Sequence, residues 1–416
     1  MKQIMYFYKG LITVLNKHLT VQQIHDYLLT YVSLDSQLLP DGVETEILFE
    51  IVFNRKSVDK ERKLIIDTLV TYINKILTKE EFINLLLELG VFMLTQGELN
   101  IVFDLATIVY NYAGDDMAHE ELKASSFVLL AEHYIKQSMW NKAFEFIDKA
   151  KIIFKNNKIG IAKCEYLLGL IKLEKGDIEE SKFELQSILT NSDIQNEPLL
   201  MAMLEMKLGI ISCIHEDYET SLCLYNKAVK KFEQSVFHYG KAEVLLCKGI
   251  IYRKLKDYQS AISQFDNCIE LAKKYDLVYI VSRGYLNKAI IFLKQKDVEL
   301  ASVFLSKSMQ LSYQLNDRSS IAKAYKLKGL IAKFKNSYLV AESYLATSLR
   351  LNRELGLELE SADVMLELGL LYRETGEVKK AFANFNNGLI YFKNQNIKII
   401  IKEIESHISK LEMLKK

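Results

Sequence analysis

A small residue recurs every 40 positions through most of this 416-residue chain. The members of the series are Gly169, Gly209, Gly249, Ala289, Gly329 and Gly369. Self-similarity at one fixed interval of this length is typical of repeat architectures, in which each unit buries its apolar face on its neighbours. The spacing therefore predicts one long solenoid in place of two or three separate globular domains.

A second small residue recurs after a first step of 38 positions and then every 40 positions, and an acidic residue recurs every 40 positions. The second small positions are Ala143, Ser181, Ser221, Ala261, Ala301, Ala341 and Ala381. Small side chains at both positions let two helices approach closely, so we expect one antiparallel helix pair per repeat. The acids Asp177, Asp217, Asp257 and Asp297 precede the second helices, where a carboxylate accepts N–H groups of the first turn. We interpret them as helix caps, and not as catalytic or metal-binding groups.

The composition favours an all-α fold and excludes several other classes. Only two prolines, Pro40 and Pro198, interrupt the chain. With 54 basic and 53 acidic residues, the chain is nearly neutral, which argues against binding to nucleic acid or to an anionic membrane. No apolar stretch reaches the roughly 20 residues of a membrane span, and Lys9 interrupts the apolar start, so we expect neither insertion nor export. Five cysteines without CxxC spacing suit a reducing cytoplasm.

These repeats resemble the tetratricopeptide repeat family in its longer, 40-residue form. The resemblance rests on the small positions and on the pairs Leu168-Gly169, Leu208-Gly209 and Leu368-Gly369. It covers about residues 83–401, with seven clear units and a weaker eighth before them, where Val102 replaces a small residue. It implies a right-handed superhelix of helix pairs whose first helices line a concave groove that holds peptides or partner helices.

The two ends of the chain lack the repeat and complete the expected domain organisation. In residues 1–82 we expect helices near 3–17, 20–33, 43–55 and 58–77. This part forms an N-terminal helical domain or cap, and Thr78 with Glu81 predicts a capping box at the start of the next helix. Residues 402–416 alternate apolar and charged side chains at helical spacing and predict a C-terminal capping helix.

The chain carries no motif that indicates catalysis. It has no phosphate-binding glycine loop, no dinucleotide fingerprint, no paired-histidine zinc motif and no nucleophile elbow. We therefore expect a protein that is not an enzyme and that needs neither a cofactor nor a metal.

The family's groove positions on each first helix select the candidate binding residues. In the N-terminal half of the array they include the apolar residues Tyr166, Met206 and Ile210. In the C-terminal half they are polar and mostly basic, namely Arg253, Lys254, Arg283, Asn287, Lys294, Lys323, Lys326 and Lys333. Facing helices about 8–10 Å apart would bring these cations to one wall, where an acidic partner would relieve their repulsion. Alternatively, the long basic chains only keep the groove hydrated.

Three functions are compatible with this pattern. The first is a cytoplasmic adaptor or scaffold that binds a protein or peptide, with apolar contacts in one half and electrostatic selection in the other. The second is a bacterial peptide-sensing regulator with an N-terminal helical effector region. The third is a structural subunit of a larger assembly. Residues 1–82 lack a compact basic recognition helix, so we expect no nucleic acid partner. The pattern specifies no oligomeric state.

Overall fold

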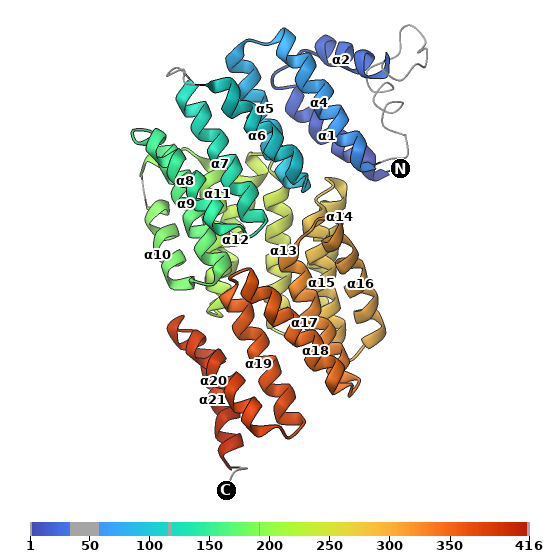
Figure 1. Cartoon of the computed structure of the whole chain (residues 1–416), viewed down its shortest axis with the longest axis vertical. Coiled ribbons are helices and arrows are strands. Elements are labelled where there is room, and N and C mark those ends of the chain that lie inside the picture. The colour runs from blue at the N-terminus through green and yellow to red at the C-terminus, as the bar shows by residue number, and fades with distance from the viewer. Residues whose placement is uncertain (1, 34–57, 115–118, 191, 414–416) are drawn as a thin grey trace. The chain divides into compact units, whose positions relative to one another are not determined.

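The computed structural model describes residues 2–33, 58–114, 119–190 and 192–413. These residues form 20 α-helices and a short 3-10 helix, Ser192–Ile194 (Figure 1). The all-α fold expected from the sequence is confirmed. The helix predicted near residues 43–55 lies outside the described part of the chain. Among the described helices, none combines the length and apolar composition needed to cross a membrane.

Three helices precede eight helix pairs and a final helix. The N-terminal helices are α1 (Lys2–Leu15), α2 (Val21–Ser33) and α4 (Val58–Ile76). The first helices of the pairs are α5 (Lys79–Gln96), α7 (Glu120–Lys136), α9 (Lys158–Lys175), α11 (Pro198–Ile214), α13 (His238–Lys254), α15 (Val278–Lys294), α17 (Arg318–Phe334) and α19 (Glu358–Glu374). The second helices are α6 (Leu99–Ala113), α8 (Trp140–Phe154), α10 (Ile178–Leu189), α12 (Tyr218–Gln234), α14 (Tyr258–Lys274), α16 (Val298–Gln314), α18 (Tyr338–Glu354) and α20 (Val378–Asn394). The final helix is α21 (Lys398–Met413).

The recurring small residues are sites of close helix contact, as predicted. A Cβ atom on Gly249 would lie 2.5 Å from Phe265 Cε1, which is too short for carbon atoms that are not bonded. The equivalent atom on Gly369 would lie 2.6 Å from the Phe385 ring. The second small positions are all fully buried. Each large buried side chain of a second helix therefore occupies the space that a first-helix side chain would need.

Most of the predicted caps are present. The carboxylates of Asp217, Asp257 and Asp297 accept the backbone N–H groups of Thr220, Ser260 and Leu300 at 3.1, 3.1 and 3.0 Å. Thr78 and Glu81 form the predicted capping box. The prediction for Asp177 is wrong, because its side chain makes no capping hydrogen bond. The Gln395 side chain instead accepts the N–H of Ile178 at 2.9 Å, so the residue that follows α20 supplies an acceptor for this turn.

The chain divides into two compact units. The first unit comprises Met1–Tyr134, Asn141–Ile161 and Ala272–Val278, and the second comprises Ile135–Trp140, Ala162–Leu271 and Tyr279–Lys416. Within the first unit, Arg62 donates to Glu98 at 2.6 Å and also to Asp276. The predicted division into 1–82, 83–401 and 402–416 follows the sequence repeat and stays a prediction.

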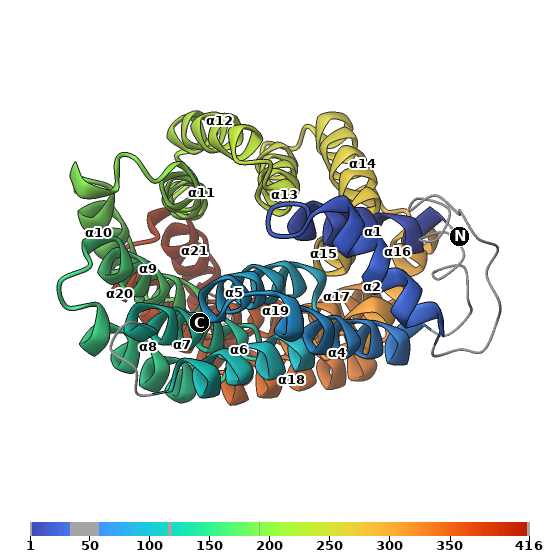
Figure 2. The same cartoon turned by 90° about the horizontal axis from the view of Figure 1, so that it is seen from above.

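The second unit has its first and second helices on different sides. Seen from above in Figure 2, α12 and α14 lie on the outer side of α11 and α13. Helices far apart in the sequence also meet inside this unit. The Tyr391 hydroxyl donates to the Gly176 carbonyl at 2.7 Å, and Trp140 Nε1 donates to the Leu355 carbonyl at 2.6 Å. Both contacts join residues 215 positions apart, so they tie distant repeats together.

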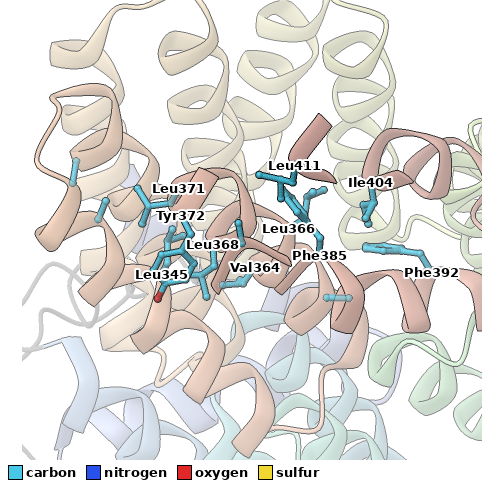
Figure 3. Packing of buried hydrophobic residues seen from close by; sticks show 14 of the residues in the cluster. Leu345, Val364, Leu366, Leu368, Leu371, Tyr372, Phe385, Phe392, Ile404 and Leu411 are labelled. Carbon is cyan, nitrogen blue, oxygen red and sulfur yellow. The ribbon is translucent and has the colours of Figure 1, made fainter. Parts of the chain in front are cut away.

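Helix α21 packs its apolar side on α20. Ile404 and Leu411 are fully buried in one cluster with Phe385 and Phe392 (Figure 3). The His407 ring stacks on Phe385 with 5.5 Å between centroids. The charged residues of α21 lie mostly on its other, exposed side, which is the amphipathic pattern expected from the sequence.

Candidate binding face on the first helices

Most of the predicted basic residues in the second unit pair with carboxylates. Arg283 lies 3.2 Å from Glu243, Lys323 lies 3.0 Å from Glu360, Lys333 lies 2.9 Å from Glu374, and Lys326 binds Asp363. Every one of these pairs joins one first helix to the next, either α13 to α15 or α17 to α19. Together with Lys207, these residues are called the charged face below. Its cations thus already have anionic partners from the chain itself.

The centre of the charged face is a buried triad of Lys207, Glu243 and Arg283. Glu243 Oε1 lies 3.4 Å from Lys207 Nζ and 3.2 Å from an Arg283 nitrogen. The side chains of Lys207 and Glu243 are only 8% and 7% exposed, so water screens the pair weakly. Burial alone would raise the pKa of Glu243, but Lys207, Arg283 and Lys136 outweigh it and lower that pKa to about 2. The triad is therefore charged at neutral pH.

The pairs between α17 and α19 are more accessible than this triad. Glu360 raises the pKa of Lys323, and in return Lys323 and Lys326 hold the pKa of Glu360 below its ordinary value despite burial. Glu367, on the same helix, behaves in the opposite way. Burial and the neighbouring Asp363 raise its pKa, because the nearby lysines do not fully offset these two effects. Helix α19 therefore carries one carboxylate, Glu360, that holds its charge more firmly than usual and one, Glu367, that takes up a proton more readily.

The remaining predicted polar residues have individual environments. Asn287 is 9% exposed, and its amide donates to the Arg283 carbonyl at 2.9 Å within the same helix. The Lys254 ammonium donates to the Cys213 carbonyl at 3.2 Å. Arg253 is half-buried and Lys294 is exposed. Neither of these two side chains makes an ion pair or a hydrogen bond with the described residues.

The predicted apolar residues are mostly covered. Tyr166 and Met206 are 4% and 3% exposed, and Met206 belongs to the core cluster between α11 and α13. Ile210 is only partly buried against that cluster. Of the three, Ile210 thus offers the most surface to a partner.

The carboxylates of the charged face were missed because only basic residues were counted. Glu243 and Asp363 occupy the second place of their repeats, as Arg283 and Lys323 do. Glu374 occupies the thirteenth place, like Lys294. The same register that selected the cations therefore contains the acids, and counting both signs would have indicated a face of alternating charge.

Other features of the described residues do not point to a different site. The larger of two described surface hollows, about 510 Å³, is lined by residues such as Arg350, Arg353 and Asn384 and includes none of the predicted residues. It is lined by residues of α18, α19 and α20, and no residue of the charged face is among them. Among the described residues, no group of three or more His, Cys, Asp or Glu side chains could hold a metal ion.

Comparisons with known proteins agree with the repeat geometry. The tetratricopeptide repeat family model matches residues 242–275. No curated protein matches the chain by sequence. Among solved structures, a Rap protein complexed with competence and sporulation factor is similar, with 10% identity and a TM-score of 0.56 over 81% of this chain and 98% of that one.

Two further solved structures have the same fold. NprR in complex with its cognate peptide NprX has 13% identity and a TM-score of 0.57 over 77% of this chain and 97% of its own. The APC/C hetero-tetramer Cut9–Hcn1 has 14% identity and a TM-score of 0.53 over 94% of this chain and 67% of its own. At these identities the likeness concerns the fold.

Proposed function

Because the chain is a tetratricopeptide repeat protein, we propose that it is a non-catalytic adaptor or scaffold that binds a protein segment or peptide on the first helices of its second unit. The observation that carries this proposal is the charged face. Charged and amide groups from α11 to α19 lie on one register of the first helices, where a bound backbone and its side chains find donors and acceptors. The second helices supply the packing that holds this face in place.

Electrostatics shape the kind of partner that this face accepts. Four of the predicted cations are already paired, so a uniformly acidic partner gains little there, because it must displace Glu243, Glu360, Asp363 or Glu374. A segment that carries both polar backbone groups and a limited number of charges fits better. The partly exposed Ile210 adds one apolar contact.

A charge swap across the face tests this proposal. In the double variant Lys323→Glu with Glu360→Lys, the ion pair is retained in reverse while the pattern of charge presented to a ligand changes. The matched control is Lys149→Glu with Glu145→Lys on α8, an exposed pair outside the charged face. Both variants and the wild type are put through selection from a randomised peptide library, with helicity checked by circular dichroism.

We expect the swap on α17 and α19 to lose or change the selected peptides, and the control to select the same peptides as the wild type. Equal selection by all three proteins would contradict a role for the charged face. Native mass spectrometry of the protein from its own cells complements the selection. A released short peptide or protein segment supports the proposal, and a tightly held folded chain favours a structural subunit instead.

A second candidate is a peptide-sensing regulator. It is supported by the fold shared with Rap and NprR, whose structures were solved with a bound factor and a cognate peptide, and by helices that precede the repeats here. Under this proposal, the N-terminal helices α1, α2 and α4 are the effector region. Hydrogen exchange of these helices with and without a selected peptide tests it, since a sensor requires their protection to change.

A further inference from the structure

Arg253 differs from the paired cations of the charged face. Its Nε atom is buried and has no hydrogen-bond partner, and no described carboxylate forms an ion pair with it. Asp363 is the acid that acts on Arg253 electrostatically, but that carboxylate is bound by Lys326. Burial lowers the pKa of the guanidinium. Removing this charged group from water costs free energy, and no described carboxylate compensates for that loss.

The groups around Arg253 are phenols and a second cation, and none of them is a carboxylate that pairs with it. Arg253 lies in the last turn of α13, and the groups that act on it include the phenol of Tyr258, in the first turn of α14, and the phenol of Tyr218, in the first turn of α12. The adjacent Lys254 donates to the Cys213 carbonyl. One repeat further on, Lys294 occupies the last turn of α15 and has no described partner. Two cations on neighbouring first helices are thus without carboxylates at the same end of the repeats.

We propose that Arg253 is a subsite for a carboxylate of the bound peptide, either its C-terminal carboxylate or an Asp or Glu side chain. This inference rests on the proposed peptide-binding function. A guanidinium binds a carboxylate through two parallel N–H donors, which gives both geometric selectivity and a strong interaction. The carboxylate would supply the missing partner that Glu243 supplies for Arg283 and Glu374 supplies for Lys333.

The test compares three sets of fluorescent heptapeptides with otherwise random, acid-free sequences. One set has a free C-terminal carboxylate, one is amidated and carries a single Asp, and one is amidated and has no acid. Affinities are measured for the wild type, for Arg253→Gln and for Lys248→Gln. The last is the matched control, because Lys248 on the same helix bonds Asn226 of α12 and lies outside the charged face.

We expect the wild type to bind one of the two carboxylate sets at least roughly tenfold more tightly than the neutral set. The set that wins identifies the source of the carboxylate. Arg253→Gln should lose this preference while still binding neutral peptides, and Lys248→Gln should keep it. Arg253→Gln with an unchanged preference, or a wild type without any preference, overturns the subsite but leaves peptide binding intact. A wild type that binds no set at all overturns both proposals.

The stability of the variant gives a second readout. Since Arg253 loses no described ion pair or hydrogen bond on substitution, Arg253→Gln should melt at or above the temperature of the wild type. A clear fall in melting temperature would show that Arg253 holds the fold together, and would overturn its assignment as a ligand subsite.

Discussion

Replacing Glu243 with glutamine should destabilise the centre of the second unit. The change removes the only described carboxylate that pairs with both Lys207 and Arg283, and leaves the buried Lys207 and the partly exposed Arg283 without it. The fall in the pKa of Glu243 from 4.5 to about 2 corresponds to roughly 3 kcal/mol of favourable interaction, at about 1.4 kcal/mol for each pH unit. Breaking a buried ion pair from one side typically costs about 3–5 kcal/mol. Both routes lead to the same order of magnitude.

The pH dependence of this effect has a definite sign. Because folding lowers the pKa of Glu243, its contribution to stability is fully present above about pH 4.5 and is lost as the pH falls toward about 2. Glu243→Gln should therefore be less stable than the wild type at pH 7, and the difference should shrink in acid.

Urea unfolding followed by circular dichroism measures the overall effect, and hydrogen exchange of α11, α13 and α15 locates it, since repeat arrays open locally. Glu354→Gln is the control, because Glu354 makes only exposed ion pairs with Arg318 and Arg350. Its stability should match the wild type. Unchanged stability of Glu243→Gln at pH 7, or an equal loss in the control, would refute the reasoning from burial.

Two further substitutions probe the packing of the repeats. Gly249→Ala should lower the free energy of unfolding by about 1–3 kcal/mol, because the new Cβ atom would lie 2.5 Å from the buried Phe265 ring. Gly388→Ala should cost less, because its Cβ atom would have nothing nearer than the Ala362 carbonyl oxygen at 3.3 Å, a tight contact that needs only a small shift. Urea midpoints compare the two variants. Trp140→Phe removes the hydrogen bond to the Leu355 carbonyl and should lower the free energy of unfolding by about 1 kcal/mol. Amide hydrogens between α18 and α19 should then exchange faster. Unchanged exchange there would contradict a stabilising contact between these distant repeats.

The helix pairs could be predicted from the sequence because close packing allows few side chains. Gly209, Gly249 and Gly369 must be glycine because an aromatic ring of the second helix occupies the space of a Cβ atom. This requirement recurs from repeat to repeat, so it is visible in the sequence as a small residue every 40 positions. The Asp177 cap could not be predicted in this way. The acceptor for its turn is Gln395, which bonds Ile178 from 217 positions away. A contact between distant repeats does not recur every 40 residues, so the repeat pattern does not predict it.

The candidate site shows the same division between local and distant information. The register placed Arg283, Lys323 and Lys326 correctly on the first helices. Whether each of them has a carboxylate partner depends on the adjacent first helix. Whether a cation repels its neighbours or is neutralised is decided by an acid on the adjacent first helix, and that acid need not occupy the same place in its repeat, as Lys326 with Asp363 and Lys333 with Glu374 show. This information was present in the sequence, at Glu243 and Asp363, and required that both signs of charge be read together.

Pairing between consecutive repeats also limits where a ligand gains from charge. An anion that approaches Arg283 or Lys326 competes with a carboxylate that is already held close by the fold, and therefore gains only the difference between the two interactions. At Arg253 there is no described carboxylate to displace, so a ligand gains the interaction without that competition. Electrostatic selection should then be concentrated at the unpaired cations Arg253 and Lys294, although the neighbouring charged face contains many more charges. The paired residues link successive first helices, and the unpaired guanidinium is the group whose energy a ligand can lower most.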